Sequence, residues 1–178
     1  PAALNNVSAD TWYRAINKVT PSPIRVEADE VTYNLHILIR FELEQMLLDG
    51  GLAIANLPDA WNDKYESYLG IRPKSDAEGV LQDIHWSGGA FGYFPTYALG
   101  NLYSAQFYAK CNEDLDDLAG QIADGQFDSF RHWLRENIHQ RGQCYSAGEL
   151  VKRITGEPLT HRYLIEYLKS KAAEVYRL

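Results

Sequence analysis

Apolar residues recur at helical spacing along most of this chain, and no segment shows the strict alternation of a half-buried strand. The clearest segment runs from Ala28 to Leu48 and is followed by Gly50 and Gly51, a common helix stop. Within it, apolar side chains three or four positions apart mark one face of a helix: Val31, Leu35, Leu38 and Phe41. The sequence therefore predicts an all-α fold.

Proline, glycine and capping residues divide the remaining chain into further helices and one long loop. Ser8 suits the cap of a short helix over 12–19, Pro58 and Gly70 bracket a second helix, and Pro95 fits the first turn of a third. Residues 71–92 carry repeated Pro and Gly without a sustained period and predict a loop, a kind of segment in which function tends to collect. Further short helices are expected after the acidic stretch 113–117, over 127–138, after the capping-box sequence 146–149 and over about 162–176.

The composition is that of a soluble globular protein, and 178 residues form a single segment, 1–178, long enough for one domain with a core. A formal net charge of −7 argues against nucleic acid and against an anionic membrane as partners. Cys111 and Cys144 are too few for a disulfide framework and favour a reducing compartment, the cytoplasm. No apolar run approaches the roughly 20 residues that cross a bilayer. Because the chain opens at Pro1 and its only methionine is Met46, an upstream part is expected to be missing.

The richest cluster of titratable side chains lies in the predicted loop, in residues 79–86, GVLQDIHW, before a glycine-rich run that leads to Tyr93. Gln82, Asp83 and His85 can exchange hydrogen bonds in backbone that approaches a ligand closely, which suits a site built to orient a histidine. The alternative is a buried loop in which Gln82 and Asp83 satisfy backbone donors while His85 and Trp86 fill core. The residues alone leave both interpretations open.

A second cluster, from Arg25 to Glu30, lies where the chain enters the long helix. Acidic residues in a first turn are expected from the helix dipole, which accounts for Asp29 and Glu30. Arg25 could clamp a carboxylate with two parallel N–H groups, or it could pair internally with Glu27 or Asp29.

The chain offers no metal-binding motif and no nucleophile triad. It has five histidines but no HExxH sequence. His132 and His139 are seven residues apart on one predicted helix, roughly 10 Å along its axis and too far to share one zinc ion. The two cysteines are far apart in sequence and suit core positions, and Ser87 lacks a nucleophile-elbow pattern. No metal is therefore expected on this chain by itself.

Both clusters resemble motifs of one protein family. Residues 24–29, IRVEAD, resemble the motif IRxxAD, and residues 79–86 resemble GxxQDxHW; both motifs belong to the thermostable, Taq-type zinc metallocarboxypeptidases. The sequences of 13–17, 30–36 and 91–103 are also similar, so the resemblance covers essentially the whole chain.

The resemblance implies a helical, two-lobed, cleft-forming zincin-like fold, of which this chain is the C-terminal part. It also implies a cytosolic, commonly homodimeric exopeptidase that releases C-terminal residues from peptides with broad tolerance, usually avoiding proline. In the family, two histidines of an HExxH helix and a later glutamate bind zinc, and the motif's own glutamate is the general base. Those elements lie upstream of the part that this chain matches. We therefore expect the chain to form the cleft wall opposite the zinc helix, to need the missing N-terminal part as its partner, and to be inactive alone.

Carried over residue by residue, the resemblance gives Arg25 the task of gripping the substrate's terminal carboxylate, with Asp29 as its orienting partner. His85 and Tyr93 are similar in position to the histidine and tyrosine with which related helical zinc peptidases stabilise the oxyanion. The other predicted site residues surround these two: Gln82 and Asp83, which would hold the imidazole tautomer, and Trp86, which would form a packing wall.

Two further functions fit the same residues. One is a helical module that binds peptides without cutting them, because Arg25 could clamp a carboxylate there too. The other is a metal-free hydrolase with Asp83 and His85 as an acid–base pair, which is disfavoured because nothing in it would activate water. As a segment of a cleft-forming enzyme, the chain is expected to expose apolar surface that packs on the missing lobe, which predicts self-association or swapping.

Overall fold

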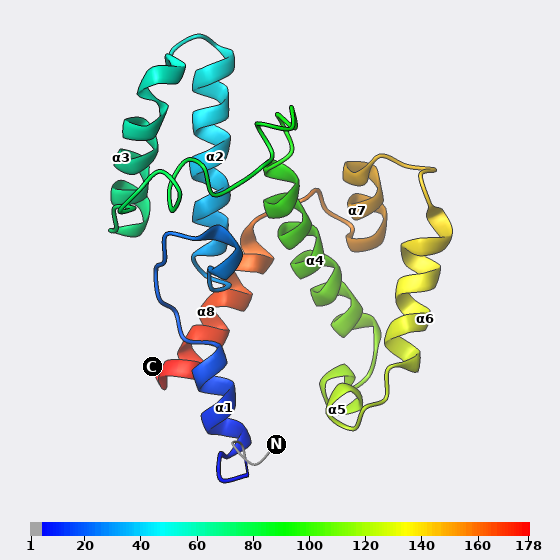
Figure 1. Ribbon diagram of the computed structural model, residues 1–178. Helices are drawn as coiled ribbons and strands as arrows, with labels where there is room; N and C mark the ends of the chain where they lie inside the picture. Colours follow the sequence, from blue (N-terminus) through cyan, green and yellow to red (C-terminus); the bar gives the residue numbers. More distant parts are fainter. Residues whose placement is uncertain (1–4) are drawn as a thin grey trace. The chain divides into compact units, whose positions relative to one another are not determined.

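The computed structural model describes residues 5–178, and all of their regular structure is helical (Figure 1). Short 3₁₀ helices cover Arg25–Glu27, Ile54–Asn56 and His139–Arg141. Within 5–178 there is no strand, which confirms the all-α class, and no helix is long and apolar enough to cross a bilayer. The α-helices are α1 (Ala9–Ile16), α2 (Tyr33–Leu48), α3 (Leu57–Leu69), α4 (Pro95–Asp114), α5 (Leu118–Ala123), α6 (Asp128–Asn137), α7 (Ala147–Thr155) and α8 (Arg162–Tyr176).

The chain packs as two compact units. The first unit contains the residues up to Ala98 together with Ser170–Leu178, and the second unit is Leu99–Lys169. Both α4 and α8 continue from one unit into the other. Every site residue predicted from the sequence belongs to the first unit.

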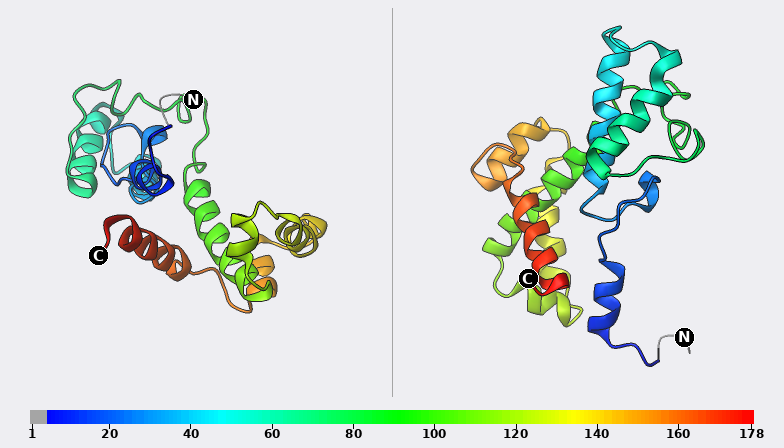
Figure 2. Two further views of the ribbon diagram at one scale, coloured as in Figure 1. Left: turned by 90° about the horizontal axis from the view of Figure 1, so that it is seen from below. Right: turned by 90° about the vertical axis from the view of Figure 1, so that its left-hand side faces the viewer.

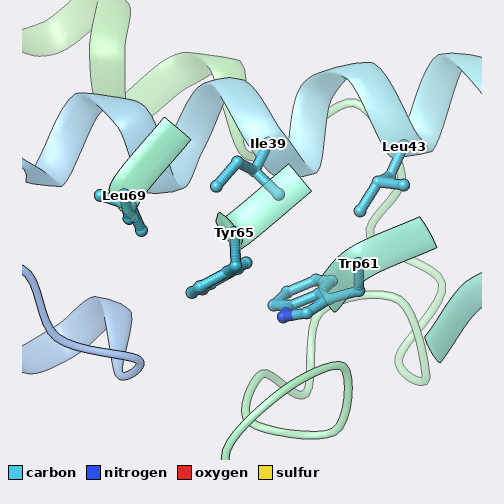
Figure 3. Packing of buried hydrophobic residues seen from close by; sticks show 5 residues of the cluster. All are labelled: Ile39, Leu43, Trp61, Tyr65 and Leu69. Carbon is cyan, nitrogen blue, oxygen red and sulfur yellow. The ribbon is translucent and has the colours of Figure 1, made fainter. Parts of the chain in front are cut away.

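The core of the first unit forms between α2 and α3, which lie side by side as an antiparallel pair (Figure 1, Figure 2). Trp61, Tyr65 and Leu69 follow one another at four-residue intervals on α3 and pack against Ile39 and Leu43 of α2 (Figure 3). All five are buried. Burial of a large apolar side chain contributes about 1.5–3 kcal/mol, so this pair of helices is a firm support for the loop that packs on it.

Most helix boundaries agree with those predicted from the capping residues. α3 ends at Gly70, whose φ of 68° is left-handed, and α8 spans the predicted residues 162–176. Ser146 and Glu149 form the capping box of α7. Ser8 caps α1 as expected, but this helix covers 9–16 rather than 12–19.

Helix α2 begins at Tyr33 rather than at Ala28 because Asp29 forms a turn in front of it. Its Oδ1 accepts the backbone N–H groups of Val31 and Thr32, at 3.0 and 2.9 Å. Its Oδ2 accepts the Thr32 hydroxyl at 3.0 Å. Such side chain to backbone bonds stabilise a turn in competition with the helix.

The apolar stripe identified on α2 from the sequence is not its buried face. Leu38 and Phe41 are 44% and 37% exposed. The buried face instead carries three polar side chains at four-residue intervals, and each is at most 3% exposed: His36, Arg40 and Glu44. These side chains bind residues of α3 and of the 71–94 loop, which explains why they lie inside.

The second unit has its own small core of Cys111, Leu118 and Trp133. Burial raises the pKa of the Cys111 thiol to about 11, which fits the predicted core position. Cys144 is exposed, so its predicted core position is wrong.

Candidate active site

Asp83 lies between two arginines in the first unit. Arg25 donates to Asp83 Oδ1 from Nε at 3.1 Å and from Nη2 at 2.7 Å, and Arg40 Nε donates to Oδ2 at 2.6 Å. The Arg40 side chain is fully buried and that of Arg25 is 8% exposed. Burial by itself would raise the pKa of Asp83, but hydrogen bonds and charge from both guanidinium groups hold that pKa below its usual value. The loop carboxylate is therefore ionised and fixed at both oxygens.

Gln82 satisfies all its hydrogen-bonding groups within the same network. Its Oε1 accepts the Arg25 backbone N–H and Arg40 Nη2, both at 2.8 Å. Its Nε2 donates to the carbonyl oxygens of Pro23, at 2.9 Å, and Glu78, at 2.8 Å. The side chain ties three separate segments together, which makes this part of the loop rigid.

A buried histidine completes the inner side of the network. His36 Nδ1 lies 3.0 Å from the Tyr65 hydroxyl, and Arg40 Nη1 donates to the His36 carbonyl oxygen at 2.8 Å. Burial, followed by the charges of Arg40 and Arg25, lowers the pKa of His36 to about 4. His36 is therefore neutral at neutral pH and acts as a core residue.

His85 and Tyr93 come together at the outer side of the network. Their rings stack with centroids 5.6 Å apart, and His85 also packs on Phe94 at 4.4 Å. Tyr93 is 48% exposed, whereas the His85 side chain is 17% exposed. The predicted catalytic pair thus forms one group, in which the tyrosine is open to solvent and the imidazole is supported from behind.

Tyr97 and Asp83 lie at the two nitrogens of the His85 ring. The Tyr97 hydroxyl is 3.3 Å from Nε2. Asp83 Oδ1 is 3.8 Å from Nδ1, which is beyond hydrogen-bond reach. The ring therefore has a polar neighbour at each nitrogen.

Three of the predicted contacts differ from those in the structure. Arg25 pairs internally, but its partner is Asp83 and not Asp29 or Glu27. Asp29 instead caps the turn before α2 and also accepts the Thr20 N–H at 2.8 Å. Gln82, expected beside the imidazole, binds the arginines and backbone instead.

Trp86 packs within a group of aromatic side chains. Its ring stacks on Phe91 at 6.0 Å and meets Trp61 and Phe94 edge-on at 6.2 and 5.8 Å. This aromatic group connects the loop to the core between α2 and α3.

Four residues of this region were missed from the sequence: Tyr97, Arg40, His36 and Glu44. The last three occur every fourth residue along α2 and so share one face of the helix. That period is visible in the printed sequence and could have identified them.

The donors do not suit a metal ion. Across residues 5–178, no group of three or more His, Cys, Asp and Glu side chains could hold one. His36 is bound to Tyr65, and the carboxylate nearest His85 is bound by two arginines. These side chains are therefore committed to other partners.

The sequence matches the family described as Carboxypeptidase Taq (M32) metallopeptidase over residues 1–172. The chain belongs to this family. Thermostable carboxypeptidase 1 of Thermus thermophilus is 50% identical over 175 residues, which are 98% of this chain and 34% of that protein. Carboxypeptidase 1 of Bacillus subtilis is 47% identical over 178 residues, which are 100% of this chain and 36% of that protein.

Solved structures of M32 carboxypeptidases agree with this assignment. The crystal structure of the M32 carboxypeptidase from Deinococcus radiodurans R1 matches with a TM-score of 0.96 and 44% identity, over 100% of this chain and 36% of that one. The apo-Mg structure of the Pyrococcus furiosus carboxypeptidase matches with a TM-score of 0.92 and 44% identity, over 95% and 34%. The chain thus spans about a third of the length of the M32 proteins that it matches.

Proposed function

We propose that this chain is the C-terminal part of a zinc metallocarboxypeptidase, and that it forms the wall of the substrate cleft that faces the metal. Membership of the M32 family supports the activity. The match to about a third of each relative supports the assignment of the metal site to another part of the protein. The observation that carries the assignment is the pairing of His85 with Tyr93 on a loop fixed by two buried arginines.

His85 and Tyr93 are assigned to the substrate's scissile carbonyl. The Tyr93 hydroxyl donates to the oxygen that becomes negative as the carbonyl is attacked, and His85 supports the same oxygen from the adjacent position. Tyr97 and Asp83 fix the orientation of the imidazole. In this assignment zinc is held by residues of the full-length protein that lie outside this chain. His85 and Tyr93 act on the carbonyl oxygen and do not bind the metal.

Arg25 is assigned a positioning role in place of the direct grip on a substrate carboxylate that the resemblance implies. Its guanidinium binds Asp83 and donates to the Tyr33 hydroxyl at 3.1 Å. It also lies over the Tyr97 ring, 5.3 Å from the centroid. These contacts hold together both groups that orient His85. Gln82 is likewise assigned a positioning role, and Trp86 is assigned to the packing wall behind His85 and the residues that orient it.

The test is kinetic and uses the full-length protein that contains this chain. Release of the C-terminal residue from a blocked dipeptide is measured for Tyr93→Phe and His85→Gln. Because each removes one stabilising donor, kcat is expected to fall about 10²- to 10³-fold with unchanged zinc content. Tyr68→Phe is the matched control, since Tyr68 donates its hydroxyl to Glu42 on the surface of the α2 and α3 pair.

Rates of Tyr93→Phe and His85→Gln within a few-fold of wild type would refute these roles. A wild-type protein that bound the dipeptide with zinc present but released no residue would instead favour the non-cutting peptide-binding module. The cytosolic location, the homodimer and the tolerance for most C-terminal residues except proline belong to the same proposal. Sedimentation of the full-length protein tests the dimer.

A further inference from the structure

A buried polar stripe runs along the side of α2 that faces α3 and the 71–94 loop. It consists of His36, Arg40 and Glu44, which occupy successive turns and are 0%, 0% and 3% exposed. The first two have been placed in the network around Asp83. Glu44 lies one turn further along and, in the described structure, forms no hydrogen bond or ion pair with Asp83 or His85.

Glu44 is bound to the loop at a single point. One carboxylate oxygen accepts the backbone N–H of Gly92, and the other has no hydrogen-bond partner among residues 5–178. No Lys, Arg or His within that range forms an ion pair with it. A buried carboxylate with one partner costs stability rather than adding to it. The packing of α2 therefore does not explain why a carboxylate is buried at position 44.

The point of attachment adjoins the proposed catalytic tyrosine. Gly92 has a φ of 79°, a left-handed conformation, and is followed directly by Tyr93. Its N–H belongs to the turn that sets the direction in which the chain enters Tyr93. A fixed acceptor at this N–H holds the turn and, through it, the stacking of Tyr93 on His85.

A second attachment lies at the other end of the same segment. Arg40 binds Gln82 and Asp83, and Asp83 lies two residues before His85. The two contacts start from adjacent turns of one helix and bracket residues 84–91. Because a helix is rigid over one turn, the distance between the two contacts is set by α2 and not by the loop.

We propose that Glu44 is a positioning residue that fastens the end of the loop at Gly92, so that α2 sets the placement of Tyr93 against His85. The effect of Glu44 on the rate rests on the proposed function, whereas its effect on the loop does not. Loop order and turnover can therefore be measured separately.

Two substitutions separate the acceptor from the side chain's bulk. Glu44→Gln keeps an oxygen that accepts the Gly92 N–H, whereas Glu44→Met has similar length and no comparable acceptor. Glu42→Met is the matched control, because Glu42 lies on the same helix but pairs with Lys64 and Tyr68 at the surface. Urea unfolding of Glu44→Met is measured beside wild type, because the variant removes a buried carboxylate but also leaves the Gly92 N–H without its acceptor. An unchanged midpoint separates a fall in rate from unfolding.

The first measurement is amide hydrogen exchange of residues 88–94 in the full-length protein. Glu44→Met is expected to raise exchange there by about tenfold or more, while Glu42→Met leaves it unchanged and Glu44→Gln restores most of the protection. The second is kinetic: Glu44→Met is expected to lower kcat by roughly 10- to 100-fold with KM within about threefold, and Glu44→Gln to recover most of it.

Unchanged exchange of residues 88–94 in Glu44→Met would overturn the attachment, whatever the rate. Raised exchange with an unchanged kcat, in a protein that His85→Gln inactivates, would overturn the positioning role. If His85→Gln were also fully active, the proposed function would fail, and the exchange result alone would decide whether Glu44 holds the loop.

Discussion

Replacing Asp83 by asparagine removes the only carboxylate that both Arg25 and Arg40 bind in the described structure. The Arg40 side chain is fully buried and that of Arg25 is 8% exposed, so the variant leaves two cations with little access to water. An asparagine offers one carbonyl oxygen and cannot serve both guanidinium groups. Breaking a buried ion pair by removing one partner costs about 3–5 kcal/mol, and we expect a loss of that size here.

The assay is urea unfolding of this chain, followed by far-UV circular dichroism and tryptophan fluorescence. With a slope of roughly 2 kcal/mol per molar, the predicted loss lowers the midpoint by roughly 1.5–2.5 M. Asp29→Asn is the matched control, because that carboxylate accepts hydrogen bonds from backbone N–H groups and from the Thr32 hydroxyl, and from no arginine in the described structure. Its removal is expected to cost about 1 kcal/mol.

A second variant tests whether the unpaired charge is the cause. Adding Arg40→Met to Asp83→Asn removes one of the two stranded cations and fills a similar volume, so the double variant is expected to be more stable than Asp83→Asn alone. A loss in Asp83→Asn no larger than that in Asp29→Asn would refute the reasoning. So would a double variant less stable than the single one.

Three further predictions follow from the same structure. Arg25→Lys keeps the charge but loses the planar fork on Asp83, and in the full-length protein it should lower kcat by roughly tenfold or more with little change in KM; a raised KM with normal kcat would indicate a direct grip on the substrate. His36 has a folded-state pKa of about 4, below its unfolded value of about 6.5, so protonation favours the unfolded state. The free energy of unfolding is therefore expected to be highest above about pH 6.5 and to fall by up to about 3 kcal/mol as the pH drops towards 4. His36→Asn should flatten this pH dependence in urea titrations. Exposed apolar side chains, including Leu81 and Ile84 at 70% and 82%, predict self-association of the isolated chain, and a strictly monomeric sedimentation profile at high concentration would contradict it.

The helices were predictable because their ends are marked in the sequence. Pro58 and Gly70 bracket α3, and Ser146 with Glu149 starts α7, since each satisfies or avoids unpaired backbone groups locally. The start of α2 was misplaced for an equally local reason. Asp29 can cap a helix or stabilise a turn, and in this structure it accepts the N–H groups of Val31 and Thr32 in a turn before the helix.

The partners within the site could not be predicted to the same degree. The sequence and the family motifs identified Arg25 and Asp83, but the bond between them joins residues 58 positions apart and depends on the path of the loop. The apolar spacing of α2 indicated a buried Leu38 and Phe41, whereas Arg40 and Glu44 lie inside. Polar residues can be buried where a loop supplies their partners, and hydrophobic periodicity alone does not detect this.

The most direct test of the account is the zinc-to-protein ratio of this purified chain after zinc loading and exhaustive dialysis, measured beside the full-length protein. We predict a ratio of about zero for the chain and about one for the full-length protein, because the donors in residues 5–178 do not form a metal site. A ratio of about one for the chain alone would contradict the account, since the cleft wall would then carry the metal itself.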